Sequence, residues 1–463
     1  MSRPQIIWFR RDLRLADQAA VRAAAAAAPV IPVFILDDDT PQHRRMGGAS
    51  RWWLHHSLMN LDADLRALGS RLILQRGPAH AVLTQIAYEV GASAIHALRH
   101  YEPWWRNAEK ALAKALPRNV ELLLHDGNFL LPPGNVTTGA GTIFKIYTPF
   151  WRALRERMPP ALAQPAPATL EIPETWPDSD AIADWNLLPT QPDWATGFEQ
   201  WTPGESGAAS RLYVFADRAA RYDSQRNLPS VEGCSRLSPH LHFGEISPAT
   251  VWNHLAQIGG EVETFLKELV WRDYAQNLIL AVPGYGGVNG KAAFDGLPWR
   301  DPDHDDDAAR DLASWQRGQT GYPIVDAGMR QLWATGWMHN RVRMLAASFL
   351  VKHLLIDWRV GERWFWDTLV DADYASNATN WQWTAGSGVD ANMFVRIMAP
   401  LSQSEKFDAG AYIRRWVPEL AGLGEAEIHD PGLLRPRSYP AKIVEHTVGR
   451  ARALDAFARL KGR

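Results

Sequence analysis

The spacing of apolar residues changes once along the chain. In residues 1–130, short apolar runs alternate with longer segments in which apolar residues recur every three or four positions. Short runs bounded by turn residues are typical of buried strands, and the longer period is typical of helices. Strands that alternate with helices predict a Rossmann-like α/β domain with a parallel sheet covered on both faces. The predicted strands are residues 6–9, 30–36, 71–75, 94–97 and 120–124, and the predicted helices are residues 17–28, 49–68, 79–88 and 104–116.

The helical period returns at about residue 205, which predicts an all-α domain over residues 205–463. Between the two domains, residues 131–204 are predicted to be a connector, because residues 158–203 hold nine prolines and little periodic pattern. Four tryptophans are expected to pin this connector to the domains: Trp176, Trp185, Trp194 and Trp201. The later predicted helices are residues 211–222, 261–280, 324–334, 338–353, 361–370, 411–420 and 443–461.

Composition narrows the class of protein. The 463 residues carry a net charge of −2, so any contact with nucleic acid must come from a local basic patch. Cys234 is the single cysteine, which excludes an intramolecular disulfide and favours the cytoplasm. No run reaches the roughly eighteen apolar residues of a membrane span, and the aspartates of residues 301–307 lack the spacing of a calcium loop. We therefore expect no membrane segment and no metal, and, without a long heptad repeat, a monomer.

Residues 336–383 carry the most informative polar pattern. Asn340, Arg343 and Met344 lie three or four positions apart in a predicted helix, so they share a face that suits a flat polar ligand. Residues 371–380 are rich in Asp, Ser and Asn and predict a loop, in which Asp371 or Asp373 would pair with Arg343. Taken singly, each of these residues is better explained by a structural salt bridge or a helix cap than by a ligand site.

Taken together, the strings WMHNRVRM, LLIDWR, GER, DADYASN and NWQW resemble the flavin-binding centre of the DNA photolyase and cryptochrome family. The similarity extends over nearly the whole chain, is strongest with class I cyclobutane pyrimidine dimer photolyases, and includes WFRRDLRL at residues 8–15. It implies an α/β domain that holds an antenna chromophore and a helical domain that binds FAD, active in its reduced anionic form. The implied activity is light-driven repair of cyclobutane pyrimidine dimers in DNA.

The segment YDSQRNLPSVEGCSRLS, residues 222–238, has a glycine and small hydroxyl residues that can bring backbone N–H groups close to a pyrophosphate. The resemblance makes this segment part of the FAD site, with Cys234 in place of a threonine. It also implies that Asn377 faces N5 of the flavin, where plant cryptochromes carry aspartate. The implied FAD-binding residues are Tyr222, Cys234, Ser235, Arg236, Leu237, Ser238, Arg343, Asp371, Asp373 and Asn377.

Glu268 and Trp271 lie three positions apart on one face of a predicted helix. An aromatic wall beside a carboxyl group suits a flipped-out dinucleotide, although a surface Glu–Arg pair beside a core tryptophan is the commoner arrangement. The resemblance implies that Glu268 hydrogen-bonds the dimer and that Trp271 packs against it. It gives the catalytic set Glu268, Asn377, Trp271, Asn340 and Met344, and the DNA contacts Arg226, Glu268, Trp271, Arg272, Asn340, Arg341, Trp383, Gln403 and Lys406.

Tryptophan is unusually frequent, with 22 residues, ten of them between Trp271 and Trp383. Tryptophan is usually core or interface mass. The resemblance implies that three of these rings, Trp299, Trp358 and Trp381, carry electrons to the flavin.

Other functions use the same fold. A cryptochrome-type photoreceptor is disfavoured by Asn377 and by the lack of a long tail, and a (6-4) photolyase is disfavoured by Asn340 with Met344. A light-independent FAD oxidoreductase is a third alternative. Folate-binding relatives carry Asn-Glu where this chain has Tyr101 and Glu102, which disfavours a folate without deciding between a folate and a deazaflavin. Another chromophore, or none, is also left open.

Overall fold

The computed structural model describes residues 3–259, 261–391 and 394–462. These residues pack as two compact units. The first unit comprises the described residues of Met1–Trp194, Trp201–Ala220 and Ser235–Pro283, and the second those of Ala195–Gln200, Arg221–Cys234 and Gly284–Arg463. The ranges 1–130, 131–204 and 205–463 divide the chain by sequence pattern rather than by packing, and stay a prediction.

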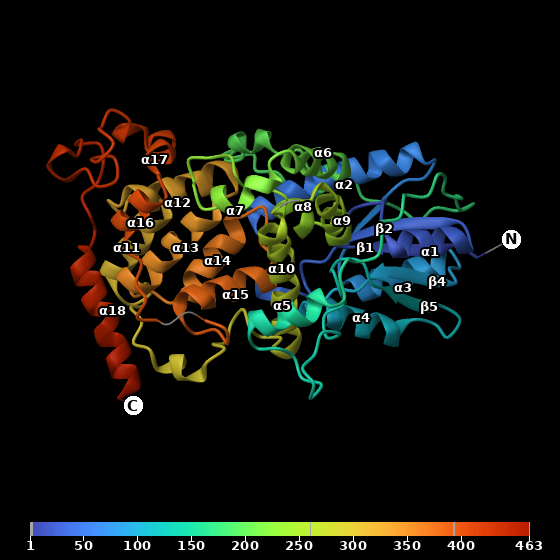
Figure 1. The fold of residues 1–463 in the computed structure, drawn as a ribbon. Coiled ribbons are helices and arrows are strands. Elements are labelled where there is room, and N and C mark those ends of the chain that lie inside the picture. The colour runs from blue at the N-terminus through green and yellow to red at the C-terminus, as the bar shows by residue number, and fades with distance from the viewer. Residues whose placement is uncertain (1–2, 260, 392–393, 463) are drawn as a thin grey trace. The chain divides into compact units, whose positions relative to one another are not determined.

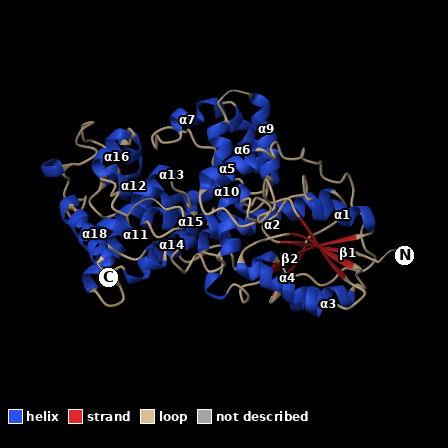
Figure 2. Ribbon diagram, turned by 60° about the horizontal axis from the view of Figure 1, so that its bottom comes forward, coloured by secondary structure: helices blue, strands red, loops and turns tan. Residues whose placement is uncertain are grey.

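The first unit is built on a five-stranded sheet with the order β3-β2-β1-β4-β5. All its pairings are parallel, with Gln5 opposite Val30 on one side and Ala94 on the other. Helices α1 and α2 cover one face, and α3 and α4 cover the other (Figures 1 and 2), so the predicted α/β domain is confirmed. The elements are β1 (Gln5–Phe9), α1 (Ala19–Ala27), β2 (Val30–Leu36), α2 (Gly48–Ala67), β3 (Ile73–Arg76), α3 (Ala79–Glu89), β4 (Ala94–Leu98), α4 (Pro103–Ala115) and β5 (Glu121–His125).

The three central strands are buried on both faces. Every residue of β1, β2 and β4 is buried, whereas the edge strand β5 is only partly covered. A strand between two helix layers needs apolar side chains on both of its faces, which is why these strands read as uninterrupted apolar runs. Ile6, Val33 and Ile95 lie in the core that results.

Helices from later in the chain complete the first unit. Trp53 in α2 is fully buried and packs edge-on against Trp201, with the ring centroids 5.5 Å apart, and against His240 at 5.1 Å. Its Nε1 donates a hydrogen bond to Glu245 over 2.9 Å. Trp201 and Trp185 are both buried, as expected for rings that pin the connector. These later helices are α5 (Tyr147–Arg155), α6 (Glu205–Ala216), α8 (Ser238–His242), α9 (Pro248–Ile258) and α10 (Glu263–Ala281).

The regular elements described in the second unit are helices, as predicted for an FAD-binding domain of this kind. No helix in the described part of the chain is long and apolar enough to span a membrane. The helices of this unit are α7 (Tyr222–Gln225), α11 (Asp306–Gln316), α12 (Pro323–Thr335), α13 (Asn340–Ser348), α14 (Trp358–Thr368), α15 (Tyr374–Ala385), α16 (Pro400–Lys406), α17 (Gly410–Trp416) and α18 (His446–Lys461).

Of two predictions for residues 336–383, the helix agrees with the structure to within two residues and the loop was wrong. The helix expected over 338–353 is α13 followed by a π-helical turn, Phe349–His353, and His339 caps its start by accepting a hydrogen bond from Arg341 N. The loop expected over 371–380 is mostly helix, because Asp373 caps α15 by accepting a hydrogen bond from Ser376 N. Asp and Ser favour caps as strongly as turns, so the composition indicated where the helix starts rather than a loop.

Candidate functional site

Arg343 is held by two parallel hydrogen bonds to one carboxylate. Its Nη1 and Nη2 donate to Oδ1 and Oδ2 of Asp371 over 3.0 and 2.9 Å, and its Nε donates to the carbonyl of Met338 over 2.7 Å. The Asp371 side chain is 3% exposed and that of Arg343 is 23% exposed. The sequence left two partners open. The structure assigns Asp371 to the pair, whereas Asp373 caps α15.

Asn377 is fixed by a residue from the preceding helix. It lies in the first turn of α15, 9% exposed, and its Nδ2 donates to the backbone carbonyl and to Oε1 of Glu362 over 3.0 and 2.9 Å. Both amide hydrogens are thus used, so the Oδ1 atom is the part of this amide left to accept a bond from a ligand. Glu362 is fully buried. It belongs to the GER string, but its contact with Asn377 could not be predicted from the sequence.

Two basic side chains expected on DNA lie at one phenylalanine, and the charge of a third, Arg226, acts on one of them. The guanidinium of Arg341 lies 4.6 Å from the ring centroid of Phe407, and Nζ of Lys406 lies 5.4 Å from it. Burial, and then the charge of neighbouring Arg226, lower the pKa of Arg341. Oδ1 of Asn227 accepts hydrogen bonds from Nε and Nη2 of Arg341 over 3.2 and 2.6 Å. Sequence reasoning did not find Asn227 and Phe407, because both contact Arg341 from more than sixty positions away along the chain.

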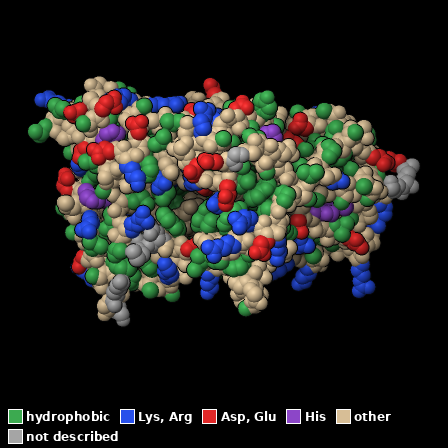
Figure 3. All heavy atoms as spheres, viewed as in Figure 1, with side chains coloured by type: hydrophobic (Ala, Val, Ile, Leu, Met, Phe, Trp, Pro, Cys, Tyr) green, Lys and Arg blue, Asp and Glu red, His purple; other side chains and the backbone are tan. Residues whose placement is uncertain are grey.

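This cluster is local. On the face drawn in Figure 3, basic and acidic side chains are interspersed rather than segregated, in keeping with the net charge of −2. The remaining polar residues predicted for this unit are placed as follows: Asn340 and Lys406 are exposed, and Met344, Gln403, Trp383, Arg226 and Cys234 are half-buried.

The three tryptophans predicted for electron transfer differ in environment. Trp381 is 2% exposed and lies against Gly361, where an added Cβ would come within 2.2 Å of the indole ring. Trp358 is fully buried, and its Nε1 donates to Oδ1 of Asn289 over 2.9 Å. Trp299 is half-buried and packs against an apolar cluster that includes Phe294. Only a residue without a side chain leaves room for the ring of Trp381.

In the first unit, α10 carries Glu268 and Trp271, both half-buried, one turn apart. Arg272, which was expected on DNA, instead points to backbone of its own unit. Its Nη1 donates to the carbonyl of Asn128 over 2.5 Å and its Nη2 to that of Leu241 over 3.1 Å. Two of its donor groups therefore serve the fold.

The predicted phosphate-binding segment is divided between the units. In the first unit, Ser235 accepts a hydrogen bond from Leu237 N over 3.3 Å, and Arg236 takes a left-handed conformation with φ of 55°. Ser238 then begins α8. In the second unit, Tyr222 is buried, and a Cβ on Gly233 would come within 2.7 Å of Gln225. In the first unit, the hydroxyl groups of this segment can donate to phosphates; in the second unit, the Arg343 guanidinium and the Asn377 Oδ1 acceptor suit the polar edge of a flavin ring, so the residues of each unit fit FAD.

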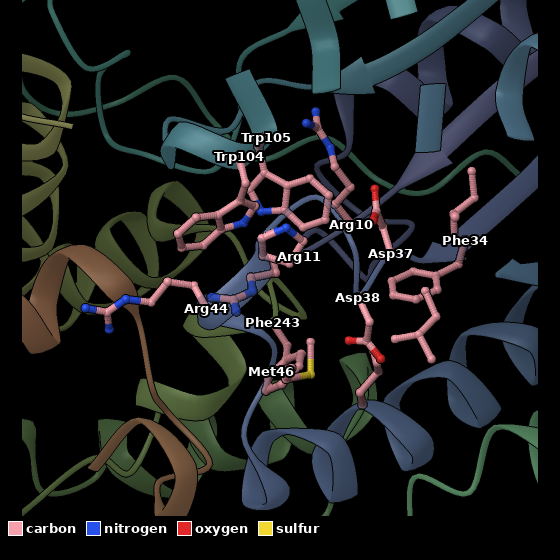
Figure 4. Close-up of a pocket in the computed structure, with 14 residues that line it drawn as sticks. Arg10, Arg11, Phe34, Asp37, Asp38, Arg44, Met46, Trp104, Trp105 and Phe243 are labelled. Carbon is pink, nitrogen blue, oxygen red and sulfur yellow. The ribbon is translucent and has the colours of Figure 1, made fainter. Parts of the chain in front are cut away.

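A pocket opens at the carboxyl ends of β1 and β2 in the first unit (Figure 4). It encloses about 510 Å³, its open mouth included. Arg10, at its wall, donates to Oε1 of Glu109 over 2.7 Å and lies 4.2 Å from the ring centroid of Trp8. The lining combines aromatic faces with both signs of charge: Arg10, Arg11, Phe34, Ile35, Leu36, Asp37, Asp38, Pro41, Arg44, Met46, Leu54, Trp104, Trp105 and Phe243.

No group of three or more His, Cys, Asp or Glu side chains in the described residues could hold a metal ion. Acidic residues 301–307 instead serve α11, which Asp305 caps by accepting from Asp307 N and Ala308 N.

Two family models match this sequence. The FAD-binding domain of DNA photolyase matches residues 265–459, and the DNA photolyase model matches residues 5–170. The first covers most of the helices described in the second unit together with α10, and the second covers the sheet.

Relatives match over the whole chain. The deoxyribodipyrimidine photo-lyase of Agrobacterium fabrum is 46% identical over 480 residues, covering 99% of this chain and 98% of that protein. A solved structure of a bacterial class III photolyase from Agrobacterium tumefaciens is 45% identical with a TM-score of 0.93, covering 100% of this chain and 98% of that one. An archaeal photolyase from Sulfolobus tokodaii, solved with two FAD molecules, is 30% identical with a TM-score of 0.84, covering 98% and 100%. The expected similarity to class I enzymes is thus only partly right.

Proposed function

Because this chain belongs to the DNA photolyase family, we propose that it uses light to split cyclobutane pyrimidine dimers in DNA. The observation that carries the proposal is the 46% identity, over 99% of this chain, with a deoxyribodipyrimidine photo-lyase. On the same ground we place the chain with the class III enzymes. Its single cysteine is compatible with a reducing compartment such as the cytoplasm, and we propose that it acts as a monomer.

The cofactor is held by side chains whose orientation is set before it binds. FAD, when bound, supplies the light-absorbing electron donor. Arg343, paired with Asp371, would offer a fixed positive charge to the ring, and Asn377, anchored on Glu362, would present Oδ1 to it. Fixed donors and acceptors lose little freedom on binding, which favours affinity and a defined ring position. In the first unit, the phosphates would lie at Ser235–Ser238. Tyr222 and Cys234, in the second unit, stay predicted FAD-binding residues.

The lesion would be read by stacking and by hydrogen bonds. In the first unit, Glu268 would bond the Watson–Crick edge of the flipped-out dimer and Trp271 would form an apolar wall. Trp383 and Met344, in the second unit, stay predicted lesion contacts. Asn340 would bridge the lesion and flavin regions. Electrons that restore the reduced flavin would pass along Trp299, Trp358 and Trp381. The DNA backbone would lie along the basic residues at Phe407, with Gln403 beside them.

Replacing Arg341 with glutamine tests the DNA-backbone contact. The plot of log affinity against log salt concentration for undamaged DNA should become shallower by about one unit, as expected when one phosphate contact is lost. Fluorescence anisotropy at several salt concentrations measures this slope. Arg459→Gln on α18, where the side chain is exposed and pairs with Asp455, is the control and should leave the slope unchanged. An unchanged slope in Arg341→Gln would remove Arg341 from the interface.

Replacing Glu268 with alanine tests the lesion contact. Repair per absorbed photon should fall about threefold to tenfold, since a hydrogen bond to a charged group contributes about 1.5 to 3 kcal/mol at most and part of the binding survives. The flavin content, read from the visible absorption, should not change. Glu263→Ala, on the same helix and exposed, should repair as the natural protein does. Equal yields in both variants would exclude a role for Glu268.

The proposed function itself is tested with two damaged oligonucleotides, one with a defined thymine cyclobutane dimer and one with a (6-4) lesion. The reduced protein should restore only the cyclobutane substrate, and only in blue light. Repair of the (6-4) lesion would make the protein a (6-4) photolyase. Failure on both, with FAD bound and photoreducible, would favour a cryptochrome-type receptor, and repair in darkness would favour a light-independent oxidoreductase.

We further propose that the pocket of Figure 4 holds an antenna chromophore. Its aromatic side chains offer flat apolar faces, and its arginines, three in number, favour an anion. A folate and a deazaflavin both satisfy this description. The chromophore released by denaturing the purified protein, identified by its absorption and mass, decides between them.

A further inference from the structure

One residue of the predicted lesion site, Trp271, stacks on an aromatic side chain that the sequence did not assign to the site. Tyr147, at the start of α5, stacks on Trp271 of α10, with ring centroids 3.6 Å apart and planes within 3°. Both residues belong to the first unit. Aromatic side chains usually pair with an offset or edge to face, because face-to-face alignment opposes their quadrupoles. A pair this closely superposed must therefore be held by something besides its own attraction.

Two hydroxyl groups hold the stack. Tyr147 OH donates to the carbonyl of Lys267 in α10 over 2.9 Å, and Tyr274 OH of α10 donates in the opposite direction to the carbonyl of Lys145 over 2.7 Å. Tyr274 also packs edge-on against both stacked rings, at 5.7 Å from Tyr147 and 5.5 Å from Trp271. Tyr274 is fully buried. The two helices are thus joined by a reciprocal pair of hydrogen bonds around a three-ring cluster.

The cluster acts on the face of α10 that carries the lesion residues. The carbonyl that Tyr147 holds belongs to Lys267, which directly precedes Glu268. One face of the Trp271 indole is covered by Tyr147, while the residue remains half-buried rather than buried. A planar ligand can therefore stack on this ring only from the side that Tyr147 does not occupy.

We propose that Tyr147 is a positioning residue that fixes the plane of Trp271 so that its free face receives the flipped-out pyrimidine pair. The inference rests on the proposed function. Holding the ring in advance removes the rotamer freedom that Trp271 would otherwise lose when the dimer binds, so the stack raises affinity for the lesion and not for undamaged DNA. The phosphate contacts proposed for Arg341 and its neighbours are independent of it.

The test measures binding in darkness by the FAD-containing full chain. In Tyr147→Ala, affinity for an oligonucleotide with one thymine dimer should fall about fivefold to tenfold, the worth of one aromatic stack, while affinity for the undamaged oligonucleotide stays the same. Tyr147→Phe keeps the ring and leaves the second hydrogen bond of the cluster, from Tyr274 to Lys145, in place, so lesion affinity should stay within about twofold of that of the natural protein. Tyr213→Ala, at an exposed tyrosine of α6, is the control. Tyr147→Leu, which fills the space without a π face, replaces the alanine variant should that one fail to fold.

A spectroscopic readout accompanies the binding assay. The near-ultraviolet circular dichroism of the stacked pair should be lost in Tyr147→Leu and kept in Tyr147→Phe. Lesion affinity that is unchanged in Tyr147→Leu, with the spectrum altered, would overturn the positioning role and leave the repair function standing. A natural protein that binds damaged and undamaged DNA equally would overturn both.

Discussion

Replacing Asp371 with alanine should lower the free energy of unfolding by about 2 to 4 kcal/mol and leave the purified protein with little flavin. The variant strands Arg343, whose two terminal nitrogens both bond to this carboxylate. The expected loss of unfolding free energy is no larger than that for a fully buried ion pair that loses one partner, because 23% of the Arg343 side chain is exposed and water can reach it. Urea denaturation and the ratio of visible to ultraviolet absorption measure the two effects.

Two comparisons separate the loss of this pair from loss of charge in general. Asp455→Ala breaks an exposed pair with Arg459 on α18 and should cost no more than about 0.5 kcal/mol. Replacing Arg343 and Asp371 together by leucine removes the stranded charge, and should recover part of the stability but none of the flavin. Full flavin content in Asp371→Ala would show that the pair does not shape the cofactor site.

Replacing Asn377 with aspartate should make the stability of the protein depend on pH in a new way. The new carboxyl group would lie 2.9 Å from Oε1 of Glu362, in a buried position. Two carboxylates so close cannot both ionise, so the folded pair keeps a proton and its upper pKa is raised. In the unfolded chain both groups ionise above about pH 4. Because the folded state then binds the extra proton, stability relative to the natural protein is intact below that pH and falls as pH rises.

The free energy of unfolding of this variant should fall by up to about 1.4 kcal/mol per pH unit between pH 5 and the upper pKa of the carboxyl pair. Unfolding curves at pH 5, 6, 7 and 8 measure it. Asn380→Asp provides the matched control, one turn further along α15, because its amide is exposed and donates to Ser376. A pH dependence equal in the two variants would mean that Asn377 does not face the Glu362 carboxyl group.

The fold was predictable where burial follows from the local pattern. The predicted β2 agrees with the structure at both ends, and the other strands agree to within two residues, because a strand covered on both faces must be apolar throughout. Prediction failed at α15. Its first residues, Asp373 and Ser376, favour turns and helix caps alike, and the choice depended on how the following apolar residues pack.

The site was predictable in its residue types but not in its contacts. The partner of Arg343 could be narrowed to Asp371 or Asp373, because these are the two aspartates of one short segment, between α14 and α15. The partners of Asn377, Arg341 and Trp271 could not be found, since Glu362, Asn227 and Tyr147 reach them through tertiary packing. A glutamate or a tyrosine in a helix carries no local sign of the residue it will touch.

The position of Trp53 in the first unit has a consequence for how the protein is made. The ring is fully buried, yet part of its cover, Trp201, His240 and Phe243, comes from residues synthesised much later. At ordinary rates of translation, on the order of ten to forty seconds pass between the appearance of Trp53 and that of Phe243. During that interval the nascent chain carries the sheet with a bare tryptophan on α2, a surface that binds chaperones or other nascent chains. The first unit can therefore complete its folding only after Pro283 has emerged from the ribosome, and not as soon as its sheet has been synthesised.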